Sequence, residues 1–110
     1  MSNFRYQAEK FASARRCLML PHIPGEAESI ADCFRECRQA FHDLDESSLD
    51  DDARKWIGEL KELMNYQGLV KESAEQGGFL AKAKTFDTDK KSEVSETVSE
   101  LATWFSKHSR

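Results

Sequence analysis

The chain has 110 residues, of which 39% are hydrophobic and 33% charged, and its net charge is −4. This length and composition are typical of one soluble folded domain, which we expect to span residues 1–110. The negative charge argues against nucleic acid or an anionic membrane as partner, and no run approaches the roughly 20 apolar residues of a transmembrane helix. Three cysteines and the lack of an apolar leader predict reduced thiols and a cytoplasmic location.

The charges are distributed unevenly along the chain. Residues 1–25 carry an excess of basic side chains, whereas residues 26–53 hold ten acidic groups against only Arg35 and Arg38. We therefore expect these two parts to attract each other within the domain, or to attract a second copy of the chain.

The first predicted helix covers residues 2–20, with Ser2 or Asn3 as its cap. Its apolar face is interrupted by Arg15, so the pattern is imperfect. The residues expected on that face are Phe4, Ala8, Phe11 and Leu18, with Ala12, Ala14 and Met19 beside them. Two prolines in the segment 21–25 then end the helix, because each forces the preceding residue away from the helical region.

The second predicted helix carries the most regular pattern in the chain. Apolar residues recur in steps of three and four, which is the spacing of one buried stripe along an α-helix. The members of this stripe are Ala27, Ile30, Phe34, Cys37, Phe41 and Leu44. It is shorter than three heptads, which favours the core face of a helical bundle over a helix that pairs with another chain.

The rest of the chain predicts a third helix, an irregular region and a last helix. Ser48, followed by Asp51, resembles a capping box at the start of the third helix, and Gly68 is a plausible stop. Within residues 66–86, Gly77-Gly78 is expected to separate two short helical pieces. Thr88 is expected to cap the last helix. The fold class is therefore predicted as all-α, a compact antiparallel helical bundle of about four principal helices with short helical pieces in 66–86.

Cys33 and Cys37 lie four residues apart, on one face of the second helix. Such a pair could coordinate a metal or take part in redox chemistry, but the further ligands of a metal site are missing from the pattern. Because Cys37 belongs to the apolar stripe and Cys33 flanks it, both are better interpreted as small core residues.

The most interesting polar group surrounds the proline break after the first helix. It comprises Arg15, Arg16, His22 and Glu26. An imidazole next to a carboxylate can perform acid–base chemistry, but no nucleophile stands at a meaningful spacing. We therefore treat these residues as candidates for binding a ligand or a partner. The simpler interpretation is that they are ordinary polar residues on an exposed turn.

The acidic run that starts at Asp43 resembles a calcium loop but departs from it at two diagnostic positions. Ser48 stands where the loop needs glycine, and Arg54 stands where it needs a bidentate glutamate. Phosphate-binding glycine loops, serine-nucleophile elbows and zinc-protease motifs are absent from the sequence. The sequence thus predicts no catalytic residue, no metal site and no cofactor.

Two functions from different classes remain open. The first is a protein-interaction or self-associating module, suggested by the missing catalytic motifs and by bulky apolar residues that exceed what a small bundle can hide. The residues in question are Trp56, Tyr66, Phe79, Phe86 and Trp104. The alternative is a small-molecule or metal-binding protein, or an enzyme, with a polar site near the break in residues 15–26 and Gly77-Gly78 as a lid.

Overall fold

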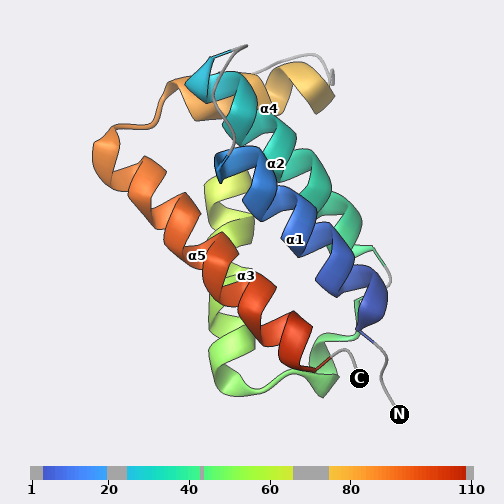
Figure 1. Cartoon of the computed structure of the whole chain (residues 1–110). Helices are drawn as coiled ribbons and strands as arrows, with labels where there is room; N and C mark the ends of the chain where they lie inside the picture. Colours follow the sequence, from blue (N-terminus) through green and yellow to red (C-terminus); the bar gives the residue numbers. More distant parts are fainter. Residues whose placement is uncertain (1–3, 20–24, 43, 66–74, 109–110) are drawn as a thin grey trace.

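A computed structural model describes residues 4–19, 25–42, 44–65 and 75–108, and in these ranges the chain is all-α, as predicted. Its elements are α1 (Arg5–Met19), α2 (Glu26–Phe41), the short 3-10 helix η1 (Glu46–Ser48), α3 (Asp51–Met64), α4 (Glu75–Lys84) and α5 (Thr88–Lys107). Figure 1 shows α1 beside α2, α5 along the other side of α1, and α4 across one end of the molecule. None of these described helices combines the length and apolarity needed to cross a membrane.

The stripe of the second helix lies in the core, as its spacing predicts. Ile30, Phe34 and Cys37 are buried, and the outer members Ala27 and Phe41 pack half-buried against the same core. Phe34 contacts two aromatic rings outside its own helix, those of Phe79 and Phe86. The stripe therefore joins α2 to α4 and to the connection that leads to α5.

Aromatic rings also hold α1 against α5. Phe11 stacks on Phe105 with ring centroids 5.0 Å apart, and Phe4 meets the same ring edge-on at 5.2 Å. Contacts of this kind stabilise a core beyond the area that they bury. Because Phe11 of α1 and Phe4, just before this helix, are both buried in the core, the side chains on the opposite face of α1 remain outside it.

Two helix caps differ from the prediction by one or two residues. Asp50, not Ser48, caps α3 by accepting the backbone N–H of Ala53 at 2.9 Å. Asp87, not Thr88, caps α5 by accepting the N–H of Lys90 at 2.9 Å. A carboxylate is an equally good cap and also interacts favourably with the positive end of the helix dipole.

The prediction of two pieces separated by Gly77-Gly78 is wrong where the structure describes that region, because α4 runs unbroken through both glycines. Each glycine costs the helix about 1 kcal/mol relative to alanine. Burial of Phe79 and Ala83 in the core offsets this cost, since tertiary packing outweighs intrinsic propensity. The other predicted piece, over residues 66–74, and the expected stop at Gly68 lie outside the described residues.

The second helix is shorter than predicted. It ends at Phe41, with His42 already in extended conformation, whereas the pattern suggested an end near Leu44. Acidic residues follow at once, and negative charges are unfavourable at the C-terminal end of a helix dipole. Leu44 still packs half-buried against the core from outside the helix.

The prediction that the bundle cannot hide all of its bulky apolar residues is wrong for the described part of the chain. Phe79, Phe86 and Trp104 are buried, and Trp56 packs half-buried against the core. Tyr66 lies outside the described residues. The large hydrophobic side chains that are exposed are Tyr6 and, more strongly, Met19, at 68% of its full accessibility.

Candidate functional site

A groove of about 450 Å³ runs between the outer sides of α1 and α5. Each helix contributes four residues to its lining: Ala12, Arg15, Arg16 and Met19 from α1, and Ala102, Thr103, Ser106 and Lys107 from α5. The spacing of the α1 residues is that of one helix face, which adjoins the face that carries Phe11 and forms one wall of the groove. The groove thus exists because α1 has a core face and a second, mixed face.

The groove combines an apolar surface with positive charge. The exposed Ala12 and Met19 supply apolar contact area, whereas Ala102 is itself buried, and two hydroxyl groups lie on the α5 wall. The charged residues of the lining are Arg15, Arg16 and Lys107, all of them cations. Arg16 also donates to Ser13 Oγ at 3.5 Å, which fixes this arginine loosely along its own helix.

A second hollow between α3, α4 and α5 has a different character. Its volume is about 270 Å³, and Leu63 and Phe86 supply its apolar surface. Its charged lining residues are of both signs: Glu59, Glu62, Glu93, Lys82 and Lys90. Because three carboxylates and two ammonium groups are mixed there, this hollow offers no strong preference for an ionic ligand.

The structure separates the candidates that the sequence placed together around the helix break. Arg15 and Arg16 line the groove described above, next to the C-terminal part of α5. Glu26 instead forms an ion pair of 2.6 Å with Lys91, near the start of α5, and lines a different, smaller pocket. His22 lies outside the described residues. Within the described part of the chain, two of the four candidates therefore share one surface.

The cysteines gather where α1 packs on α2. Cys33 and Cys37 are buried and Cys17 is half-buried, all three as free thiols. A hydrogen bond with Cys37, together with burial, raises the pKa of Cys33 well above its ordinary value. Burial and the nearby Cys33 raise the pKa of Cys17 as well. Raised values keep both groups as neutral thiols, the form that is weakest as a nucleophile and as a metal ligand.

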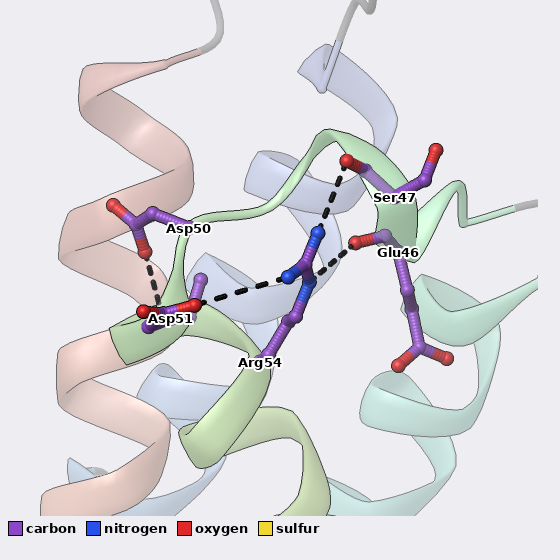
Figure 2. Close-up of polar contacts among 6 residues, drawn as sticks. Glu46, Ser47, Asp50, Asp51 and Arg54 are labelled. Carbon is purple, nitrogen blue, oxygen red and sulfur yellow. Dashed lines mark hydrogen bonds and ion pairs between the residues drawn. The ribbon is translucent and has the colours of Figure 1, made fainter.

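The acidic connection before α3 is organised by an arginine (Figure 2). Arg54 donates to the backbone carbonyls of Glu46 and Ser47 at 3.1 and 3.2 Å, and lies 3.8 Å from Asp51. Lys61 pairs with the side chain of Glu46 at 2.8 Å. Two cations thus neutralise part of the segment that resembled a calcium loop. Among the described residues, no three His, Cys, Asp or Glu side chains are placed to hold a metal.

The α5 half of the groove could not be found from the sequence. Thr103, Ser106 and Lys107 lie about ninety residues from Arg15 in the chain. In the sequence, nothing distinguishes them from other exposed positions of a helix. The weak signal that did exist was Arg15, a charge that interrupts an otherwise apolar face. It marks the point at which the helix presents a second face.

Comparison with known proteins gives no match for this chain, whether with protein-family models, curated proteins or solved structures. Its function therefore has to be argued from its own side chains.

Proposed function

We propose that this protein is an interaction module that binds an acidic, amphipathic helix of a partner protein in the groove between α1 and α5. The observation that carries the proposal is the lining of this groove, where every charged residue is a cation and the remaining surface is largely apolar. An amphipathic helix can lay its apolar side chains into such a groove while its acidic residues meet the basic walls.

The charges and the apolar surface have separate roles in this proposal. Met19, exposed at 68%, and the exposed Ala12 supply the area whose burial favours binding. Arg15 and Arg16 can form paired hydrogen bonds with carboxylates, which selects an acidic partner over a neutral one. Because these cations are exposed, we expect binding to weaken with increasing salt.

A synthetic helical peptide of Glu, Leu and Ala, with leucines three and four residues apart, tests the proposal directly. Fluorescence anisotropy should show saturable binding that weakens between 50 and 500 mM salt, about the range over which screening shortens from over 10 Å to a few Å. The same peptide with Gln in place of Glu should bind at least about tenfold more weakly.

Charge reversal in the groove provides the matched protein variants. R15E/R16E should reduce affinity for the acidic peptide at least about tenfold. K55E/K84E makes the same change of net charge at two exposed positions of α3 and α4, and should leave affinity within about twofold. An equal loss of affinity in both variants would mean that net charge alone causes the effect, and would contradict binding in the groove. Binding of a small anion such as citrate, without binding of the peptide, would favour a small-molecule site instead.

A further inference from the structure

The outward side of α5 changes from negative to positive along the helix. Its first part carries four acids in steps of three and four, which places them on one line, and all but the half-buried Glu93 are exposed. These acids, here called the acidic stretch, are Asp89, Glu93, Glu96 and Glu100. The same line continues into Thr103 and Lys107, which belong to the wall of the groove. One helix therefore presents an acidic stretch and a basic end.

Most of these charges have no partner within the chain. Glu93 pairs with Lys90, which lies beside the acidic stretch, at 3.6 Å. Among the residues that the structure describes, no cation pairs with the other three acids, and no acid pairs with the cations of the groove. Glu100 and Lys107 lie two turns apart, about 10 Å along the helix axis, and no ion pair joins them. Both regions therefore remain available to a second molecule.

We propose that two copies of this chain pair through antiparallel α5 helices about a twofold axis, so that the acidic stretch of each copy lies against the basic groove of the other. The inference rests on the proposed function, since it uses the same groove, and it names a second copy as a partner. The charges set the direction, because parallel α5 helices would place acid against acid and base against base.

The register of the pair follows from the same charges. With the axis between residues 101 and 102, Glu96 lies opposite Lys107 of the second copy. Glu100 then lies opposite Thr103 of the second copy, whose hydroxyl can donate to it. The two arginines of the groove border the same part of α5 as Lys107, so they face the same two acids. The twofold axis makes each of these contacts twice.

The side chains near the axis are small enough for the helices to approach closely. Thr103 and Ser106 line the α5 wall of the groove, and Ser99 lies two turns before Ser106 on the same side of the helix. Helix axes come nearest where the side chains between them are small. Pairing would also cover Ala12 and part of the exposed Met19, which adds some apolar area to a contact that is mainly ionic.

This geometry limits the size and the strength of the assembly. Both copies contribute the same surface, so association ends at the dimer. One helix and one groove from each copy place the contact near the lower end of specific interfaces, which bury about 1,200 Å² or more. We therefore expect a reversible dimer that weakens with salt and that the acidic peptide dissociates, because the peptide and the second copy occupy the same groove.

Charge-reversed variants test the pairing by sedimentation velocity in about 50 mM salt. R15E/R16E makes the groove acidic and E96K/E100K makes the acidic stretch basic, so each variant alone should dimerise at least about tenfold more weakly than the wild type. Mixed in equal amounts, they should form a 1:1 heterodimer, because each groove then meets a stretch of opposite charge. R15E/R16E/E96K/E100K should regain the wild-type affinity to within about threefold, which also shows that the substituted chain folds.

A control and two outcomes complete the test. D52K/E62K reverses two exposed acids of α3, so it changes the net charge as E96K/E100K does, and it should dimerise like the wild type. A wild-type chain that stays monomeric at about 1 mM in low salt, or a dimer that no charge reversal weakens, overturns the inference. If the monomeric chain still binds the acidic peptide, the proposed function stands, and if it binds neither, both proposals fail.

Discussion

At the scale of single residues, Asp50 connects two helices that are far apart in the sequence. One carboxylate oxygen accepts the backbone N–H of Ala53 and the other accepts the indole Nε1–H of Trp104, each at 2.9 Å. The hydrogen bond from Ala53, followed by that from Trp104, lowers the pKa of Asp50. His108 stacks on the same indole ring, with centroids 3.9 Å apart. The start of α3 is thereby attached to the end of α5.

Because its pKa is lower in the folded than in the unfolded chain, Asp50 stabilises the fold when ionised. This contribution is complete above the unfolded value, about 4 for an aspartate, and is lost as the pH falls through the lower folded value. Asp50→Asn keeps a capping oxygen but cannot ionise, so its melting temperature should fall less than that of the wild type between pH 5 and 2. Thermal melts followed by tryptophan fluorescence measure this difference. Parallel curves for the two proteins would show that Asp50 does not contribute.

The three thiols should differ in reactivity. Cys33 and Cys37 are fully buried, and the raised pKa of Cys17 leaves little thiolate near neutral pH. A thiol reagent at pH 7.5 should label half-buried Cys17 slowly, and label the other two only in denaturant. The variant Cys17→Ser should show no labelling in the native state. Rapid native labelling of two or three thiols would contradict the burial of the α1–α2 contact.

At the scale of secondary-structure elements, the helices pack through a shared hydrophobic core, and the ion pairs between elements lie on the exposed surface around it. The pair of Glu26 with Lys91 connects the start of α2 to α5, but its side chains are 51% and 40% exposed. Exposed pairs contribute about 0–1 kcal/mol, because water screens the charges and both side chains lose freedom.

We therefore expect a small coupling energy between these two helices. A double-mutant cycle with Glu26→Gln and Lys91→Met should give a coupling below about 1 kcal/mol in urea unfolding at low salt. In 1 M salt the coupling should vanish, since the screening length falls to about 3 Å. A coupling of several kcal/mol that persists in salt would mean that the pair is structurally essential.

At the scale of the whole molecule, aromatic packing around Phe34 joins three segments. Its fully buried ring lies 5.8 Å from the ring of Phe79 in α4 and 6.1 Å from that of Phe86. Phe34→Ala should cost about 3–5 kcal/mol, a large part of the 5–15 kcal/mol that stabilises a typical domain. Met19→Ala, at an exposed position, should change stability by less than about 0.5 kcal/mol. Urea unfolding followed by circular dichroism compares the two, and equal effects would contradict the core assignment.

Features of the fold that depend only on neighbouring residues could be predicted from the sequence, whereas features that depend on packing between helices could not. The buried stripe of α2 was predicted correctly because residues three and four apart are neighbours on every α-helix, whatever surrounds the helix. The cap of α3 was predicted two residues too early because Ser48 and Asp50 are both good capping residues, and only the helix geometry selects between them. The unbroken α4 was missed because its glycines oppose a helix locally, and the burial that offsets this comes from α2.

The sequence by itself determined that this chain is helical, where the core faces of its main helices lie, and that Arg15 and Arg16 occupy a surface different from that core. Only the tertiary structure decided what those arginines face. It placed Lys107 and the alanine of α5 across from them and gave Glu26 a different partner. The reason is physical: helix periodicity is a local property of the chain, whereas a groove is made by two helices whose separation in sequence carries no pattern.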